Sequence, residues 1–245
     1  MSRQPFKANS IMKKLLLIIS GSLFLTPAFA QSSFQGFYGQ IATGYENNTA
    51  SNLNFTDSTG DNESHYASNQ SFGGAPLVIG VGYNFSVAPK WLIGIGADYS
   101  ALSQKSSTYT QTVCDGGCDI FWSGSTIEVK NRINVYVAPG YAIDKDKLAY
   151  FKAGYSMVNA TLNSPTAYSH SGGSGSMTSV SQSNNLNGFI LGAGYKQIIS
   201  GGLYGFAEVN YMSYGKKTYN NGSNTSVSPS LSSYQGLIGV GYKFN

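Results

Sequence analysis

Apolar residues occupy every second position in eight stretches of the chain, and Gly, polar or charged residues fill the positions between them. These stretches are residues 37–45, 77–85, 91–99, 127–141, 149–157, 188–196, 203–211 and 235–244. A period of two places the apolar side chains on one face of a β-strand and the others on the opposite face. Each stretch reaches the roughly 9 to 11 residues that a tilted strand needs to cross a bilayer. The pattern predicts eight β-strands, and no helical period competes with it.

The connections between these stretches alternate in length. Long polar connections alternate with short links, the long ones at 46–76, 100–126, 158–187 and 212–234 and the short ones at 86–90, 142–148 and 197–202. Bacterial outer-membrane barrels have short periplasmic turns and long extracellular loops. We therefore expect an all-β fold, namely an eight-stranded antiparallel transmembrane β-barrel. It would lie in the bacterial outer membrane as a monomer, with both chain ends in the periplasm.

The polar face of the predicted strands carries charged residues, which are Asp98, Glu128, Lys130, Arg132, Lys152 and Glu208. In a membrane barrel the apolar face contacts lipid and the polar face lines the lumen, whereas a soluble barrel of the lipocalin type has the reverse arrangement. Tyr and Phe at the ends of the stretches suit the aromatic girdles of a membrane barrel. Because eight strands leave an interior just wide enough for side chains, opposite charges there would pair. This predicts a lumen closed by salt bridges, and a small porin-like channel for ions or small solutes is the alternative.

The N-terminal segment has the pattern of a secretory signal. Two lysines precede an apolar run at 15–25, which is shorter than the roughly 20 residues of a transmembrane helix. Ala28 and Ala30 are the small residues that a cleavage site before Gln31 requires. We expect residues 1–30 to be a cleaved signal peptide.

Removal of the signal peptide changes the charge of the chain. Residues 1–30 contain four basic and no acidic side chains, so the barrel domain at 31–245 keeps 11 basic and 11 acidic side chains. A neutral domain lacks the basic surface that binds the phosphates of nucleic acids, and no nucleic-acid partner is expected. Translation starts either at Met1, with an extended N-terminal region, or at Met12.

Cys114 and Cys118 are the only cysteines of the sequence and are separated by a short segment that contains two glycines. We predict a local disulfide, because an exported chain passes through an oxidising compartment. A metal site would need further Cys or His ligands nearby, and a redox site would need a thioredoxin-like βαβ pattern. The sequence offers neither, so no metal and no cofactor are expected.

The two histidines, His65 and His170, are the candidate catalytic residues in the long connections, where each follows a serine, Ser64 or Ser169. Some outer-membrane barrels modify lipid A with such residues. A general base must reach its nucleophile, and no predicted strand holds either pair in register. A lipid A-modifying enzyme is therefore the less favoured alternative, and we predict that the protein is not an enzyme.

The long connections differ in charge. The first one, 46–76, contains four acidic residues and no Lys or Arg, whereas the last one contains Lys216 and Lys217. Two interactions would use these charges: docking of the two loops on one another, or binding of a cation by the acidic loop. The favoured interpretation is that the polar loops are simply solvated. The low-complexity segment 169–185 is expected to be disordered at its tip.

Several strand ends repeat a Gly-x-Gly-Tyr pattern, in GVGYNF at 80–85, GAGYK at 192–196 and GVGYKF at 239–244. With FAEVNYMSYG at 206–215 and the closing aromatic strand, the chain resembles the small outer-membrane β-barrel family that includes OmpA/OmpX-type and opacity-like proteins. The resemblance implies a structural or surface-interaction role, in envelope integrity or adhesion. It also implies contacts with outer-membrane lipid and lipopolysaccharide, and with the barrel-assembly machinery through the C-terminal strand. In this chain Asn245 follows the aromatic Phe244 that would end the assembly signal.

Overall fold

The computed structural model describes residues 32–57, 64–220 and 225–244. The predicted signal peptide, with its cleavage site at Ala28, Ala30 and Gln31, lies outside these residues. Within the described part of the chain, no helix is long and apolar enough to cross a membrane. The strands are β1 (Gly36–Ser51), β2 (Asn54–Asp57), β3 (Ser64–Tyr66), β4 (Gln70–Gly74), β5 (Leu77–Ala88), β6 (Trp91–Ser100), β7 (Gln104–Lys105), β8 (Tyr109–Cys114), β9 (Ile120–Asp144), β10 (Lys147–Asn163), β11 (Ala167–His170), β12 (Gly173–Ser176), β13 (Ser181–Ser200), β14 (Leu203–Tyr214), β15 (Tyr219–Asn220), β16 (Thr225–Val227) and β17 (Ser230–Lys243).

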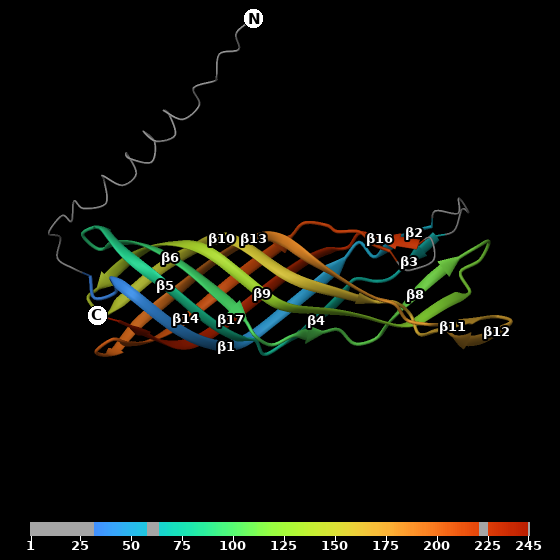
Figure 1. Ribbon diagram of the computed structural model, residues 1–245, viewed down its shortest axis with the longest axis horizontal. Coiled ribbons are helices and arrows are strands. Elements are labelled where there is room, and N and C mark those ends of the chain that lie inside the picture. The colour runs from blue at the N-terminus through green and yellow to red at the C-terminus, as the bar shows by residue number, and fades with distance from the viewer. Residues whose placement is uncertain (1–31, 58–63, 221–224, 245) are drawn as a thin grey trace, which may run out of the picture. The chain divides into compact units, whose positions relative to one another are not determined.

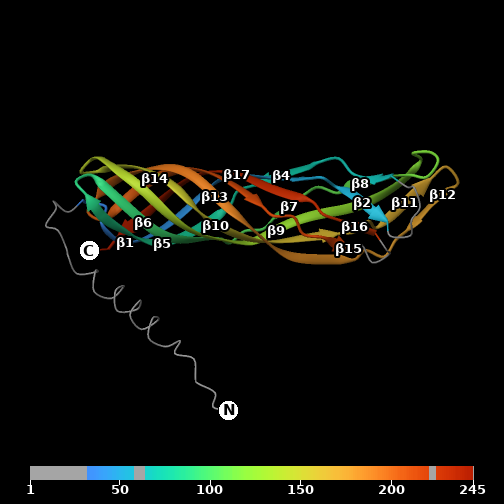
Figure 2. The ribbon, with the colours of Figure 1, turned by 90° about the horizontal axis from the view of Figure 1, so that it is seen from above.

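Eight of these strands close into a ring in which every neighbouring pair is antiparallel. The order is β1, β5, β6, β9, β10, β13, β14 and β17, and β17 pairs with β1 to complete the ring. Figures 1 and 2 show these strands winding around a common axis. The two ends of the described chain meet at the barrel end with the short turns, where the Phe244 N–H donates to the Phe37 carbonyl. The predicted eight-stranded antiparallel barrel is confirmed.

The strands at the other end of the barrel are longer than the alternating stretches of the sequence. β9 is 25 residues long and pairs with β6 and β10 in the ring, and beyond the ring with β8 and β11. It belongs there to a second sheet in the order β15, β16, β2, β3, β8, β9, β11 and β12. We call this the outer sheet, and Figure 1 shows its strands at the end opposite the short turns. The expectation of disorder in 169–185 is wrong, because this segment contributes to β11, β12 and β13.

The barrel has an apolar outer face and a mixed interior. Outward side chains such as Val81 and Phe151 are 60% and 71% exposed, whereas inward Leu92 and Met212 are fully buried. Strand β6 shows the alternation along its whole length, with exposed and buried residues in turn over most of Trp91–Ser100. The outer face is therefore covered by apolar groups that need a non-aqueous environment.

Inward glycines make room for large rings on the neighbouring strands. Gly194 of β13 lies opposite Tyr150 of β10, and a Cβ at Gly194 would overlap the Tyr150 ring. Gly241 of β17 lies opposite Tyr204 of β14 in the same way. Three further pairs repeat the arrangement, namely Tyr38 with Gly82, Tyr136 with Gly96, and Phe206 with Gly239. The repeated glycines of the sequence are thus cross-strand partners of the aromatic residues that fill the lumen.

Strand β9 contains a bulge at Asn131. Lys130 lies opposite Asn159 of β10 and Ile133 lies opposite Met157, so β9 has one more residue than β10 between the two pairs. Asn131 has a φ of 53°, in the left-handed region that Asn tolerates better than most side chains. One extra residue reverses the faces that the side chains before and after it occupy.

This bulge corrects part of the predicted lumen. Before the bulge, Ile127 and Val129 are buried in an interior apolar cluster, so Glu128 and Lys130 lie on the outer face of β9. The prediction that Glu128 and Lys130 line the lumen is wrong, because the alternation does not run through the bulge. After the bulge, Arg132 points into the barrel and is 2% exposed.

Candidate functional site

The charged side chains inside the barrel form the candidate functional site, and Lys152 of β10 is the centre of its first group. Its Nζ lies 2.6 Å from Asp98 Oδ2 of β6 and 3.0 Å from Glu208 Oε1 of β14. Asn134 Nδ2 donates to the second Asp98 oxygen at 2.5 Å, and the Tyr150 hydroxyl donates to the second Glu208 oxygen at 2.7 Å. One ammonium group therefore pairs with two carboxylates, whose other oxygens also have donors.

Arg132 of β9 is the centre of the second group. Its Nη1 lies 2.5 Å from Glu46 Oε2 of β1, and its Nε donates to the Tyr214 hydroxyl at 2.8 Å. Its Nη2 donates to Asn48 Oδ1 at 3.0 Å and to Ser233 Oγ at 3.1 Å. Three other strands of the ring, β1, β14 and β17, thus supply the partners of a single guanidinium group.

Two amide side chains join the groups around Lys152 and Arg132 into one network. Asn210 Nδ2 donates to Glu208 Oε1 at 2.8 Å and to Gln235 Oε1 at 3.1 Å. Gln235 Nε2 in turn donates to Glu46 Oε2 at 2.9 Å. Hydrogen bonds therefore connect all three carboxylates of the lumen, and the link between Asp98 and Glu208 passes through the Lys152 ammonium group.

Lys196 of β13 lies apart from the carboxylates in a cage of aromatic rings. Its Nζ is 4.0 Å from the ring centre of Tyr38 and 5.0 Å from that of Tyr204. It donates to Gln40 Oε1 at 3.1 Å, which also accepts from the Tyr204 hydroxyl at 3.1 Å. The ring faces supply the partial negative charge that stabilises a buried cation.

The sequence predicted four of the six charged residues that the structure brings into the lumen, namely Asp98, Arg132, Lys152 and Glu208. It missed Glu46, which was assigned to a loop, and Lys196, which has the same parity as the inward Gly194. Glu46 would have followed from extending the alternation of β1 by one inward position, and Lys196 already lies at an inward position of the predicted stretch 188–196. With Glu46 and Lys196 in place of Glu128 and Lys130, the lumen holds three acidic and three basic side chains.

Apolar side chains close the barrel on both sides of the charged network. Towards the outer sheet lies a buried cluster that includes Ile190 and Met212, and towards the short turns lies one that includes Phe34 and Leu148. An internal cavity beside Lys196 has a volume of about 10 Å³, and so does one beside Arg132. Such a volume holds about one water molecule.

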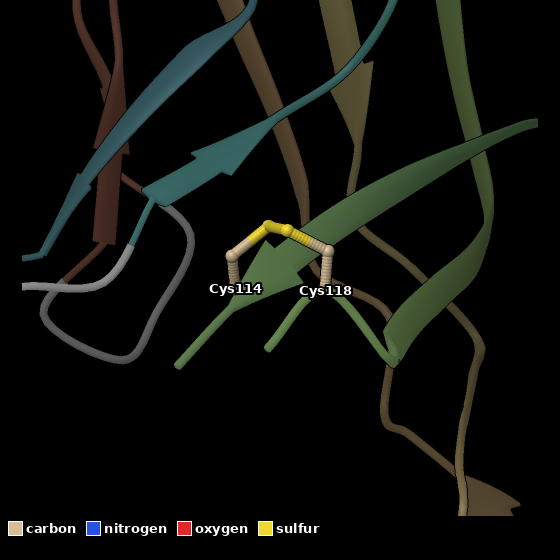
Figure 3. Close-up of a disulfide and its surroundings, with 2 residues drawn as sticks. All are labelled: Cys114 and Cys118. Carbon is tan, nitrogen blue, oxygen red and sulfur yellow. A yellow bond between two sulfur atoms is a disulfide. The ribbon is translucent and has the colours of Figure 1, made fainter. Parts of the chain in front are cut away.

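The predicted disulfide between Cys114 and Cys118 is confirmed, with an S–S distance of 2.06 Å. It closes the tip of the hairpin formed by β8 and β9 in the outer sheet (Figure 3). The Ser171 hydroxyl of the neighbouring β11–β12 hairpin donates to Asp119 Oδ2 at 3.2 Å. Among the described residues, no group of three or more His, Cys, Asp or Glu side chains is arranged to hold a metal ion.

The two histidines lie in the outer sheet. His65 is buried, stacks on Phe55 with a ring separation of 4.3 Å, and lies 2.7 Å from Gln111 Oε1 through its Nε2. Ser64 is adjacent to His65 on β3 and is exposed, so the two side chains point to opposite faces. His170 accepts a hydrogen bond from the Gly172 N–H at 3.0 Å. The predicted absence of enzymatic activity stays a prediction.

A closed antiparallel barrel with an apolar outer face and a charged interior defines a β-barrel membrane protein. The family model for the outer membrane protein beta-barrel domain matches residues 16–244, and the chain belongs to this family. The protein is therefore located in the bacterial outer membrane. A comparison of the sequence with curated proteins gives no significant match.

Solved structures of small outer-membrane barrels are similar to this chain. OprG from Pseudomonas aeruginosa is 15% identical with a TM-score of 0.52, and the match covers 86% of this chain and 97% of OprG. Ail, the attachment invasion locus protein of Yersinia pestis, is 14% identical with a TM-score of 0.38, covering 86% and 99%. The outer membrane protease OmpT from Escherichia coli is 9% identical with a TM-score of 0.48, covering 89% and 99%. At this identity, the likeness to OprG supports the fold alone.

Proposed function

We propose that the protein is a non-conducting outer-membrane barrel with a structural or surface-interaction role, in envelope integrity or adhesion. The filling of the lumen is the observation that carries this proposal. Three acidic and three basic side chains lie there, Arg132 and Lys152 form ion pairs with all three carboxylates, and apolar clusters lie on both sides of them. A permeating ion would have to displace these contacts, because the cavities beside Lys196 and Arg132 have room for about one water each.

The surface-interaction part of the proposal is supported by the outer sheet. Its strands present exposed aromatic side chains, such as Tyr66, Phe121 and Tyr168, on a framework of paired backbone. Exposed aromatic residues are enriched in protein interfaces, because they bury a large area and lose little conformational freedom. If the lumen does not conduct, the exposed surface of the outer sheet is the part of the molecule that carries the function.

Planar-bilayer recording of the refolded protein tests the non-conducting state. We expect no discrete current steps for the wild type or for Arg132→Met, because the apolar cluster around Ile190 and Met212 remains in the second case. The alternative, a small porin-like channel, predicts current steps in the wild type and a changed ion selectivity in the variant. Regular steps in the wild type would refute the proposal.

The enzymatic alternative has its own test. Incubation of the refolded protein with lipopolysaccharide, followed by mass spectrometry of lipid A, should give no mass change. A mass change that His65→Ala or His170→Ala abolishes would establish a lipid A-modifying enzyme instead.

A further inference from the structure

Lys152 and the two carboxylates beside it have the arrangement of a nucleophile, an acyl group and a proton carrier. The Lys152 Nζ lies 2.6 Å from Asp98 Oδ2 and 3.0 Å from Glu208 Oε1. Since the carboxyl carbon of Asp98 is bonded to Oδ2, the Lys152 nitrogen lies at most about 4 Å from that carbon. A lysine amine held this close to a carboxyl group is positioned to attack it.

The three side chains are almost completely withdrawn from water. Those of Lys152, Asp98 and Glu208 are 1%, 3% and 3% exposed, and the Lys152 Nζ lies 4.1 Å from the centre of the Tyr136 ring. In water, an ammonium and a carboxylate do not condense to an amide, because both ions are better hydrated than the product. In this lumen the ions have already lost their hydration, so a neutral amide would replace a buried charge pair.

The neighbouring groups are those that an amide-forming reaction needs. Asn134 Nδ2 donates to Asp98 Oδ1 at 2.5 Å, so it would stabilise the negative charge that this oxygen gains when the carbon is attacked. The Tyr150 hydroxyl donates to Glu208 Oε2 at 2.7 Å, which leaves Oε1 directed at the Lys152 ammonium. A cavity of about 10 Å³ lined by Glu208 and Tyr150 has room for one water molecule, the second product.

We propose that Lys152 and Asp98 condense to an amide bond inside the barrel, with Glu208 as the proton carrier. Glu208 first passes a proton from Nζ to Asp98 Oδ2, and the neutral amine then attacks the carboxyl carbon. Glu208 next passes a second proton from the nitrogen to Oδ2, the bond from carbon to Oδ2 breaks, and this oxygen leaves as water. The third ammonium proton stays on the amide nitrogen, and Glu208 ends as a carboxylate. The ion pair in the structure is the state before this reaction.

The bond would join two strands that do not pair with each other. β6 and β10 lie on either side of β9 in the ring, and the new amide would connect them through the lumen. This activity goes beyond the proposed surface role, because the lumen is filled with or without the bond. Freshly refolded protein still holds the ion pair, so its stability at that time reports the charges alone.

Mass spectrometry of the full chain tests the inference. Protein kept unfolded in urea should have the mass of the sequence, and protein refolded into phospholipid vesicles should lose the mass of one water molecule. Trypsin should then leave residues 91–105 joined to 148–196, because a modified Lys152 is no longer a cleavage site. The Lys147–Asp144 pair is the internal control. Its nitrogen and oxygen lie 2.9 Å apart, but its side chains are 45% and 44% exposed, so hydrated ions remain and no bond should form.

Three variants separate the roles of the reacting groups. Glu208→Gln keeps the shape of the side chain but cannot carry protons, so the bond should form at least about 100-fold more slowly. Lys152→Arg keeps the positive charge without a nucleophilic amine and should give no joined peptides. Asp98→Asn should give the same joined peptides with the loss of ammonia in place of water, because the leaving group is then an amide nitrogen.

The inference is overturned if the refolded wild type keeps its full mass after prolonged incubation. It is also overturned if the loss of water maps to another pair of residues, or if Glu208→Gln loses water as fast as the wild type. A gel-shift assay for the folded barrel, run on every variant, separates failure to react from failure to fold.

Discussion

Replacement of Lys152 by Met tests how far charge balance holds the lumen together. The variant leaves Asp98 and Glu208, which are 5% and 4% exposed, without the ammonium group that lies 2.6 and 3.0 Å away. Removal of one partner from a buried ion pair costs roughly 3–5 kcal/mol. Asn134 and Tyr150 still donate to the two carboxylates, so the cost stays below that of two independent pairs. We expect the free energy of unfolding to fall by about 3–5 kcal/mol.

The matched variant neutralises the carboxylates as well. Lys152→Met with Asp98→Asn and Glu208→Gln leaves neither carboxylate charged beside the missing ammonium group, and it should recover at least about 2 kcal/mol of the loss. Lys147→Met, which removes an exposed pair with Asp144, is the control and should leave the stability unchanged.

Urea unfolding of the proteins in phospholipid vesicles, followed by the fluorescence of Trp91 and Trp122, measures these differences. A loss of less than about 1 kcal/mol for Lys152→Met would show that water or local rearrangement replaces the ammonium group. A triple variant as unstable as the single one would show that the side-chain packing of Lys152, and not its charge, is what the barrel needs. Either result would refute the reasoning from charge balance.

Substitutions at three further places test other parts of the fold. Asn131→Ala should lower the free energy of unfolding by about 1–2 kcal/mol and Asn131→Gly by less, in the same urea assay, because Ala is disfavoured at positive φ; equal losses would contradict a role for the bulge conformation. Gly194→Ala should cost about 1–3 kcal/mol, because the added methyl group overlaps the Tyr150 ring, and Tyr150→Leu in the same chain should reduce that cost. Cys114→Ser/Cys118→Ser should leave barrel stability unchanged and make the hairpin tip up to about 30-fold more sensitive to limited proteolysis, as expected for a short loop released from its cross-link; a loss of barrel stability would contradict a local role.

The period of two was enough to predict the barrel and most of the charged lumen. Asp98, Lys152 and Glu208 follow from the alternation because lipid on one side forces every second residue to be apolar. Outside the lipid, every second residue no longer has to be apolar. The part of β1 that contains Glu46 therefore shows no alternation of apolar and polar residues by which it could be recognised as strand. The bulge at Asn131 could not be predicted either, because it depends on how β9 pairs with its neighbour β10.

The disulfide and the long connections show the same limit. Cys114 and Cys118 were paired correctly because they are the only two cysteines of a chain with an export signal. The strands of the outer sheet, such as β11 and β12, are built from Gly, Ser and Tyr, a composition that is also typical of mobile loops. β11 pairs with β9, which is far away in sequence and therefore leaves no local pattern, and β12 pairs in turn with β11.

The length of β9 has a consequence for any molecule that approaches from outside the cell. At a rise of about 3.3 Å per residue, its 25 residues form one strand of roughly 80 Å that belongs to both the ring and the outer sheet. A molecule that binds the far end of β9 would contact a backbone that is already ordered by its pairing in the ring, so this protein would lose little conformational entropy on binding. Variation in the tip's side chains would then alter what is recognised while the underlying support stays fixed.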